Sequence, residues 1–374
     1  MQQIQNIQIS HFRNISSQEI LFHPKFNFFF GQNAQGKTSV LEALYFLSEL
    51  KSFRSSDFTH SIQHSNDQFL LESILKQEDL RFEIKVKASF QEKQVWLNGK
   101  TPRPYRKLRR LLPYVLFLPE SIRLFRNSPS ERRNYFDDHF SLLSEEYSHL
   151  VQEYARIYKQ KHQLLIQQAE GSYTPKNIWE IWNEQIARQG AKLTYSRFQW
   201  GQSLGKMFQF YFSDLSDQEW KATLHYEPYQ SLISEEKSEE EIYDLYNAEI
   251  QKRFSEELTR QQVLVGPHRD DWMIHLGSEK LKEDGSQGQH RIAVAALKLA
   301  EMEHLRTHQL FPIALFDDLL SELDTHRNRK VMECLAHSPC QVFLTSVEPH
   351  GFSWKDLEGS RFELQEGQVF LKKE

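Results

Sequence analysis

The chain has 374 residues, a formal net charge of −5 and two cysteines. Cys334 and Cys340 are too few for a disulfide framework, and they lack the further ligands that a zinc site needs. No stretch of about eighteen apolar residues occurs, and the N-terminus lacks the regions of a signal peptide, so we expect a cytoplasmic protein without membrane spans. With 39% hydrophobic residues and only 14 glycines and 12 prolines, the composition predicts a folded, helix-rich protein of two or three domains.

The N-terminal part predicts an antiparallel sheet around one helix. Apolar and polar residues alternate in short segments, and Asn98-Gly99 is a tight-turn dipeptide. A helical spacing of apolar residues then follows a run of phenylalanines. The expected strands are 4–12, 26–30, 69–76, 80–90 and 94–97, and the expected helix is 39–50.

A phosphate-binding loop is predicted between strand 26–30 and helix 39–50. The octet has the pattern G-x-x-x-x-G-K-T, whose glycines let backbone N–H groups surround a polyphosphate at a helix N-terminus. Lys37 would reach the β- and γ-phosphates, and Thr38 would ligate Mg²⁺. The alternative is a Gly-rich turn that binds nothing, but the flanking strand and helix favour the phosphate loop. The predicted cofactor-binding residues here are Gly31, Gln32, Asn33, Ala34, Gln35, Gly36, Lys37, Thr38 and Ser39.

The middle of the chain predicts a helical insertion, after which α/β elements return. Helices are expected at 130–141, 145–168, 178–205 and 239–258, with a strand at 220–226. Strands are then expected at 262–265, 272–276, 313–316 and 341–346, helices at 289–305 and 324–336, and a hairpin at 361–372. The predicted division is 1–125 and 261–374 for the two parts of an α/β domain and 126–260 for an inserted helical lobe.

Two carboxylates end the apolar strand 311–316. Such a pair is what a site of Mg²⁺ binding and water activation requires beside a phosphate loop. Asp317 would hold Mg²⁺, and Asp318 would orient or deprotonate an attacking water. Paired aspartates could instead cap the helix that follows. Lys37 and Asp317 are 280 residues apart in the sequence, far more than one sheet requires, which is the reason for predicting an insertion.

A second anion site is possible at the start of helix 289–305. Ser286, Gly288 and Gln289 stand where helix N-terminal amides could meet a phosphate. A plain serine N-cap would look the same and is favoured by this segment alone. Ser321 and Asp324, just after the aspartate pair, stand at the offsets of a dimer-contact loop.

Basic residues concentrate in one segment of this acidic chain. Between residues 101 and 133 there are nine arginines and lysines, and they suit phosphate neutralisation by a DNA-binding surface. A solvated charge run without a partner is the alternative. The DNA-contact candidates are Arg103, Arg106, Lys107, Arg109 and Arg110. Elsewhere, residues 266–271 (G-P-H-R-D-D) could be misread as a hydrolytic metal site, but no further close ligand completes one.

Together these motifs resemble the ATPase head of the ABC type that SMC proteins share with their DNA-repair relatives. The chain also resembles the RecF family of bacterial recombination mediators over nearly its full length. The segments that carry this resemblance are 11–14 (H-F-R-N), 51–54 (K-S-F-R), 115–133 and 266–271. The implied fold is an α/β head with a mixed sheet and N-terminal antiparallel strands, plus an inserted, mainly helical lobe.

The resemblance implies an ATP-dependent homodimer on DNA. ATP and Mg²⁺ would be bound by the phosphate loop and Asp317, and closed over by Ser286, Gly288 and Gln289 of the second copy. Lys37 and Asp318 would act in a slow, DNA-stimulated hydrolysis, and Arg54 would approach nucleotide or DNA. Expected partners are gapped or double-stranded DNA, RecR and RecO, and indirectly RecA. A transporter engine or a nuclease fits less well, because no membrane segment and no second metal domain are found.

Overall fold

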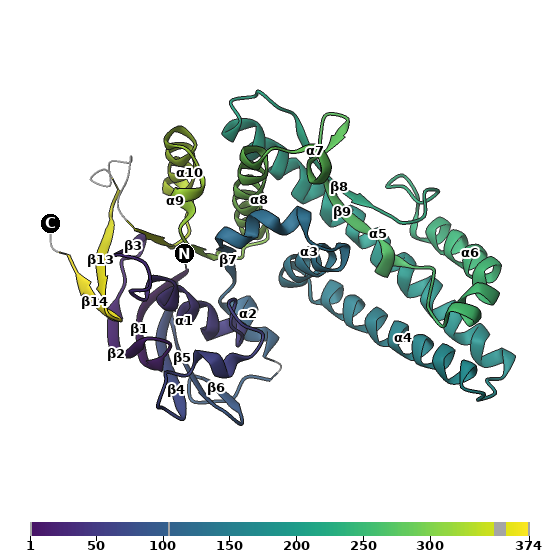
Figure 1. The fold of residues 1–374 in the computed structure, drawn as a ribbon, viewed down its shortest axis with the longest axis horizontal. Helices are drawn as coiled ribbons and strands as arrows, with labels where there is room; N and C mark the ends of the chain where they lie inside the picture. The colour runs from purple at the N-terminus through teal and green to yellow at the C-terminus, as the bar shows by residue number, and fades with distance from the viewer. Residues whose placement is uncertain (1, 104, 348–356, 373–374) are drawn as a thin grey trace. The chain divides into compact units, whose positions relative to one another are not determined.

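The computed structural model describes residues 2–103, 105–347 and 357–372, which fall into two compact units (Figure 1). The first unit comprises Met1–Ile122, Asp214–Asp217 and Arg291–Glu374, and the second comprises Arg123–Ser213 and Gln218–His290. The first unit is thus built from both ends of the chain. Within the described residues, no helix is both long and apolar enough to cross a membrane.

A five-stranded antiparallel sheet forms one layer of the first unit, with strand order β2-β1-β4-β5-β6. Four of these strands were predicted, and their apolar residues alternate as expected. β2 was missed because its sequence, ISSQEIL, is mostly polar and its alternation is weak. The strands are β1 (Gln2–Phe12), β2 (Ile15–Leu21), β4 (Gln68–Gln77), β5 (Leu80–Ser89) and β6 (Lys93–Leu97).

The other layer is a six-stranded mixed sheet of order β14-β13-β3-β12-β11-β7, in which only β14 runs antiparallel to its neighbour. Because β3, β12 and β11 are parallel neighbours, their carboxyl ends meet at one edge. The phosphate loop, Thr345 and Asp317 therefore lie together. The strands are β3 (Phe26–Phe30), β7 (Tyr114–Phe117), β11 (Ile313–Phe316), β12 (Val342–Ser346), β13 (Gly359–Gln365) and β14 (Gln368–Leu371).

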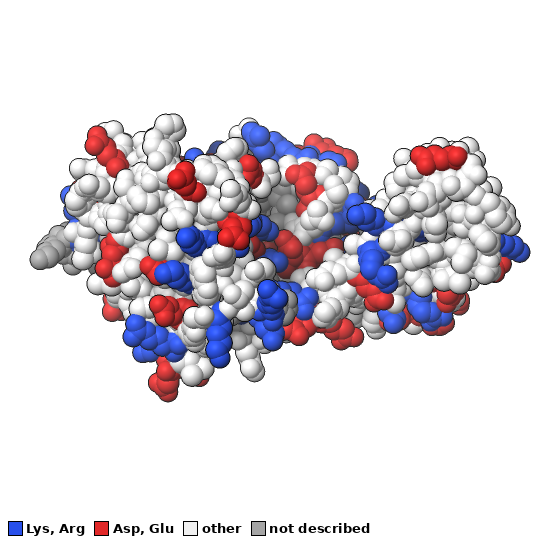
Figure 2. All heavy atoms as spheres, turned by 90° about the horizontal axis from the view of Figure 1, so that it is seen from below, with Lys and Arg blue, Asp and Glu red and all other residues white. Residues whose placement is uncertain are grey.

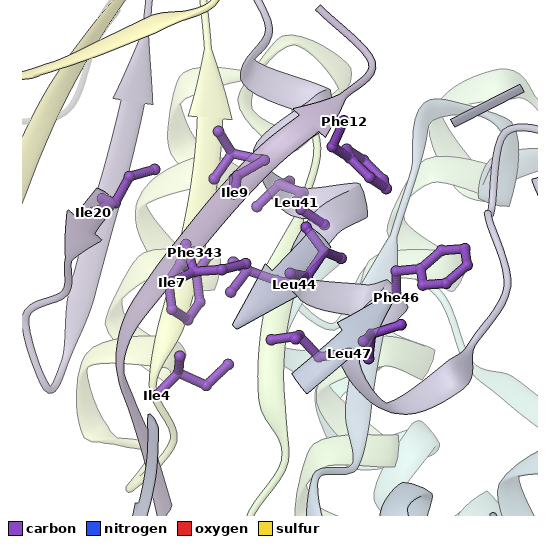
Figure 3. Packing of buried hydrophobic residues seen from close by; sticks show 14 of the residues in the cluster. Ile4, Ile7, Ile9, Phe12, Ile20, Leu41, Leu44, Phe46, Leu47 and Phe343 are labelled. Atoms are coloured by element: carbon purple, nitrogen blue, oxygen red, sulfur yellow. The ribbon is translucent and has the colours of Figure 1, made fainter. Parts of the chain in front are cut away.

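Helix α1 (Lys37–Glu49) is buried between these layers. Its apolar side chains pack in one cluster with those of β1 and with Phe343 of the mixed sheet, and all are within 1% of complete burial (Figure 3). Burial of each such side chain stabilises the fold by about 1.5–3 kcal/mol. The helix that starts at Lys37 is thereby held rigidly. The labelled contributors from β1 and α1 are Ile4, Ile7, Ile9, Phe12, Leu41, Leu44, Phe46 and Leu47.

The second unit is mainly helical, as predicted for the insertion. It contains α3 (Pro129–Leu143), α4 (Glu145–Ala169), α5 (Lys176–Leu215) and α6 (Glu239–Arg260), and a small antiparallel sheet of order β10-β9-β8. β9 (Asp271–Leu276) pairs with β8 (Ala222–Glu227) of the insertion. This pairing places residues 271–276 in the second unit, which extends to His290, whereas the helical lobe was predicted over 126–260. The strand expected at 262–265 is wrong: these residues form a bend without strand pairing.

The remaining elements are short, except for two helices of the first unit that were predicted. These are α8 (Gln287–Thr307), whose first residues belong to the second unit, and α10 (Thr325–His337). The short elements are η1 (Phe58–Ser61), α2 (Arg106–Leu111), η2 (Pro119–Arg126), η3 (Pro267–Arg269), β10 (Glu279–Lys280), α7 (Leu281–Asp284) and α9 (Leu319–Glu322).

Candidate nucleotide site

The loop between β3 and α1 requires both of its glycines. Gly31 has φ +146°, and a Cβ there would lie 2.6 Å from the carbonyl oxygen of Leu364. Gly36 has φ +109°, and a Cβ there would lie 2.9 Å from the side-chain nitrogen of Asn14. An L side chain would be strained at both positions. The backbone of the loop therefore needs glycine at both positions where the phosphate-loop pattern has it.

Residues distant in the sequence hold this loop in place. Ser39 donates from Oγ to Oδ1 of Asn14 at 2.9 Å. Gln35 accepts from the backbone N–H of Glu366 on its side-chain oxygen, at 2.5 Å, and from Gly367 on its carbonyl oxygen, at 3.1 Å. The loop is therefore tied to the turn of the β13–β14 hairpin, a contact that no sequence signal indicated.

Lys37 is almost fully buried at the start of α1. Its Nζ donates to the carbonyl oxygens of Gly31 and Gln32, the second at 2.9 Å. Burial lowers the pKa of Lys37, and the nearby carboxylates of Asp318 and Asp317 oppose that shift. A desolvated ammonium inside the loop is placed to meet phosphate oxygens.

Asp317 lies at the centre of a hydrogen-bonded cluster at the end of β11. Thr38 donates from Oγ1 to Oδ2 of Asp317 at 2.9 Å, and Thr345 donates from Oγ1 to Oδ1 at 2.6 Å. Burial raises the pKa of Asp317, while these two hydroxyl donors lower it. A hydroxyl and a carboxylate oxygen in contact are the hard ligands that Mg²⁺ prefers, so Thr38 and Asp317 fit a magnesium site.

Asp318 follows in a conformation rarely adopted by residues other than glycine. Its φ is 50° and its ψ 29°, which is the left-handed region. Its N–H donates to Oγ1 of Thr345 at 2.9 Å. This conformation costs roughly 1–3 kcal/mol for a residue other than glycine, and aspartate tolerates it better than most residues do. Asp318 begins α9 but makes no side-chain cap bond, so its carboxylate is not used as an ordinary N-cap.

A cavity of about 830 Å³ brings these groups together. The phosphate loop, Asp317, Asp318 and Thr345 line one part of it, and residues of the η1 region line another. Its volume lies within the range of small-molecule sites. The residues that line it outside the loop and the acidic cluster are Arg13, Asn14, Arg54, His60, Ile62, Gln63, His64, Pro119 and Val347.

Glu42 organises the cationic wall of this cavity, although the sequence analysis did not single it out. Its buried carboxylate accepts from Nε of Arg13 at 3.0 Å and from Oγ of Ser52 at 2.6 Å. Nη1 of Arg54 lies 3.8 Å from the same carboxylate. The segments 11–14 and 51–54 are therefore joined through one acid on α1.

The predicted second anion site has a capping function inside the chain. The N–H of Ser286 donates to Oε1 of Gln289 at 2.8 Å, and the N–H of Gln289 donates to Oγ of Ser286 at 3.2 Å. This reciprocal pair is a capping box at the start of α8. At Gly288, a Cβ would meet nothing nearer than Oγ of Ser286 at 3.9 Å, so packing within the chain does not require glycine there. None of the three residues lines the 830 Å³ cavity.

The two residues of the predicted dimer loop also make local bonds. Ser321 donates from Oγ to the carbonyl oxygen of Asp318 at 2.9 Å. Asp324 is the N-cap of α10, accepting from the N–H of Arg327 at 3.0 Å. Both residues are partly or largely exposed.

Several of the basic residues at 101–133 are structural. Arg109 pairs with Glu49 at 2.8 Å, and Arg132, fully buried, pairs with Asp271 at 2.6 Å. Arg103 and Lys107 are exposed. On the face seen in Figure 2, basic and acidic side chains are interspersed and form no surface of a single sign. Arg109 and Arg132 are thus paired within the chain, so fewer residues of segment 101–133 are candidates for DNA contact than the sequence suggested.

The segment 266–271 is a buried structural network. Asp270 accepts from the hydroxyl of Tyr226 and from the N–H of Tyr229, and Arg133 donates to its backbone carbonyl. His268 bonds to the hydroxyl of Tyr154 at 2.7 Å, and burial lowers its pKa to about 4. Across the described part of the chain, no three or more His, Cys, Asp or Glu side chains gather as the ligands of a metal ion.

Comparison with known proteins identifies the family. The family described as "RecF/RecN/SMC N terminal domain" matches residues 3–357. A protein of Geotalea uraniireducens named DNA replication and repair protein RecF is 32% identical over 370 residues, which cover 98% of this chain and 99% of the relative. The chain belongs to the RecF family.

Solved structures agree with this assignment. One described as the recombination mediator protein RecF with ATP in the RecFOR pathway superposes with a TM-score of 0.87 at 26% identity, covering 99% of both chains. An Smc head bound to a winged-helix domain of ScpA gives 0.59 at 14% identity, which shows a shared fold alone. The fold is therefore that of the ABC-type ATPase head found in RecF and SMC proteins, with an added helical unit.

Proposed function

We propose that this RecF family member is an ATP-dependent DNA-binding protein of recombinational repair and replication-fork maintenance. ATP with Mg²⁺ occupies the 830 Å³ cavity. Lys37 and the loop amides bind the phosphates, and Thr38 and Asp317 hold the metal, which withdraws charge from the phosphate oxygens. The observation that carries this proposal is the contact of Thr38 and Thr345 with Asp317 beside a phosphate loop that requires its glycines.

ATP joins two copies of the chain head to head. Ser286, Gly288 and Gln289 of one copy cover the nucleotide held by the other, and Ser321 and Asp324 contribute to the same contact. The exposure of Ser286 and Gly288 supports this, as does a glycine that the chain's own packing does not need. The dimer clamps gapped or double-stranded DNA without reading bases and, with RecO and RecR, helps to load RecA.

Hydrolysis resets the dimer and is slow. Asp318 orients or deprotonates the water, and its side chain is one methylene shorter than the glutamate expected there in the wider superfamily. The strained backbone at Asp318 and its bond to Thr345 support a catalytic placement for this carboxylate.

Light scattering tests the dimer directly. The wild-type chain is expected to be a monomer without nucleotide and a dimer with ATP and Mg²⁺. Lys37→Met is expected to lose nucleotide binding, and Ser286→Arg to bind ATP while remaining monomeric. A Ser286→Arg variant that still dimerises contradicts the trans arrangement.

A further inference from the structure

Arg126, an exposed arginine at the end of η2, is bonded to the first turn of α8. Its Nε donates to Nε2 of His290 at 3.3 Å. His290 is fully buried, and its backbone N–H donates to the carbonyl oxygen of Ser286 at 3.0 Å. His290 therefore lies one helical turn from Ser286. All three residues belong to the second unit, and the guanidinium of Arg126 is thus held beside the capping box.

The backbone on both sides of Arg126 is anchored in the core of the second unit. Arg132, which is fully buried, donates from Nη1 to the carbonyl oxygen of Phe125 at 3.2 Å and also to that of Asn127. The side chain of Phe125 is itself fully buried. Because its backbone is already fixed, Arg126 loses less conformational freedom when it meets a ligand than an arginine on a free loop would.

The bond to His290 leaves most of the guanidinium available. Arginine can only donate, so Nε2 of His290 accepts and the imidazole is neutral. Burial, together with the charge of Arg126, lowers the pKa of His290 to about 4, in agreement with a neutral ring. Elsewhere in the described part of the chain, the side chain of Arg126 has no hydrogen bond or ion pair. Its two Nη groups can therefore bind an anion together.

The cap of α8 lacks a cation of its own. Residues 286–290, S-Q-G-Q-H, include no lysine or arginine, and the side chains of Ser286 and Gln289 already accept N–H groups of the cap. The preceding segment 282–285, K-E-D-G, has one lysine against two acids. Removing a polyphosphate from water against neutral groups is unfavourable unless a cation compensates its charge. Arg126 is placed to supply that charge.

We infer that Arg126 contacts the phosphates of the ATP held by the second copy, and that His290 positions it for this contact. The inference rests on the proposed function, in which Ser286 and Gly288 cover that nucleotide. The contact forms only when the dimer closes. Arg126 therefore strengthens the ATP-dependent dimer without raising the affinity of a single chain for ATP.

The test compares Arg126→Gln, His290→Leu and His290→Gln with the control Arg156→Gln. Arg156 is exposed on α4, which packs against α3 and α6, and its substitution removes the same charge. A fluorescent ATP analogue measures nucleotide affinity at protein concentrations where the chain is monomeric. Light scattering measures dimerisation with ATP and Mg²⁺ in the absence of DNA.

Arg126→Gln should bind the analogue as the wild type does but dimerise at least about ten-fold more weakly, because a charge-assisted contact to phosphate is lost at each site. His290→Leu removes the acceptor and should dimerise roughly three-fold more weakly. His290→Gln keeps an oxygen that can accept from Arg126 and should stay within about two-fold of the wild type. Arg156→Gln should match the wild type.

Four outcomes overturn the inference alone. The first is that Arg126→Gln dimerises as the wild type does, and weaker DNA binding by such a variant would assign Arg126 to DNA. The second is a loss of analogue binding by monomeric Arg126→Gln, which would place the contact in the chain's own site. The third is an equal loss in Arg156→Gln, which would be an effect of net charge. The fourth is an equal loss in the two His290 variants, which would remove the positioning role.

The wild-type chain separates these failures from a failure of the proposed function. If it remains monomeric with saturating ATP and Mg²⁺, the head-to-head dimer itself is overturned. If it dimerises and any of the four outcomes is found, only the role of Arg126 and His290 is lost.

Discussion

Thr345 connects the two acidic residues of the nucleotide site: its Oγ1 donates to Asp317 at 2.6 Å and accepts from the N–H of Asp318 at 2.9 Å. A hydroxyl has one proton, so Thr345 can serve both partners only with that proton directed at the carboxylate. The Thr345 hydroxyl therefore holds the Asp317 carboxylate and the Asp318 backbone in a fixed orientation.

Thr345→Val is expected to weaken Mg²⁺-dependent nucleotide binding as pH falls. The hydroxyl lowers the pKa of Asp317 against the raising effect of burial, so its removal raises that pKa further. The midpoint at which acid abolishes binding should move to higher pH, while Thr345→Ser, which keeps the donor, should keep the wild-type midpoint. Titration of nucleotide binding against pH at fixed Mg²⁺ measures both. Identical midpoints for the valine and wild-type chains contradict this role.

Asp317→Asn is expected to stabilise the nucleotide-free chain at neutral pH. A raised carboxyl pKa means that the folded state favours the protonated form, so the group destabilises the fold as pH rises through that pKa. The neutral amide removes this cost, and the gain should vanish below the ordinary pKa of aspartate, where both states are protonated. The melting temperature measured against pH checks the trend. The same variant should lose the stabilisation that ATP with Mg²⁺ gives the wild type.

Gly31→Ala is expected to destabilise the chain by more than about 3 kcal/mol, because the added Cβ adds a clash with the backbone of Leu364 to the cost of positive φ. Gly277→Ala is the matched control: it also has positive φ, +63°, but open space around its Cβ. That control should cost only about 1 kcal/mol. Urea unfolding of both variants compares the two losses, and the excess at Gly31 reports the clash together with the greater strain of φ +146°. Equal losses would show that the loop and the hairpin relax without cost.

The parts of the fold that repeat locally were predictable from the sequence, whereas contacts between distant side chains were not. The phosphate loop and the strand before Asp317 each have a local sequence pattern. Both follow the carboxyl ends of parallel strands in one sheet, so their closeness could be predicted. The anchoring of Gln35 by the β13–β14 turn depends on a residue 331 positions away and has no local pattern. Likewise, helical periodicity could not indicate that residues 271–276 pair with β8 of the second unit.

The basic segment shows the same limit. Charge density alone could not distinguish Arg132, which is buried against Asp271, from exposed residues such as Lys107.

Arg132→Gln is expected to cost about 3–5 kcal/mol, because it leaves a largely buried carboxylate without its partner. Arg188→Gln breaks the exposed pair with Glu184 and should lower stability far less, because solvent screens that pair. Thermal unfolding measures both changes. A similar loss in the two variants would mean that burial of Arg132 adds nothing to the pair.

Charge reversal at exposed positions tests the DNA surface separately from folding. Arg103→Glu and Lys107→Glu should each weaken DNA binding and lower the slope of log affinity against log salt by roughly one, because each lost phosphate contact releases one fewer counterion. Arg109 is unsuitable for this purpose, since it pairs with Glu49, whose side chain is 5% exposed. Lys176→Glu, on the exposed start of α5, is the control for net charge alone. Binding by all three variants with the same affinity and the same salt slope would place the DNA contact elsewhere on the chain.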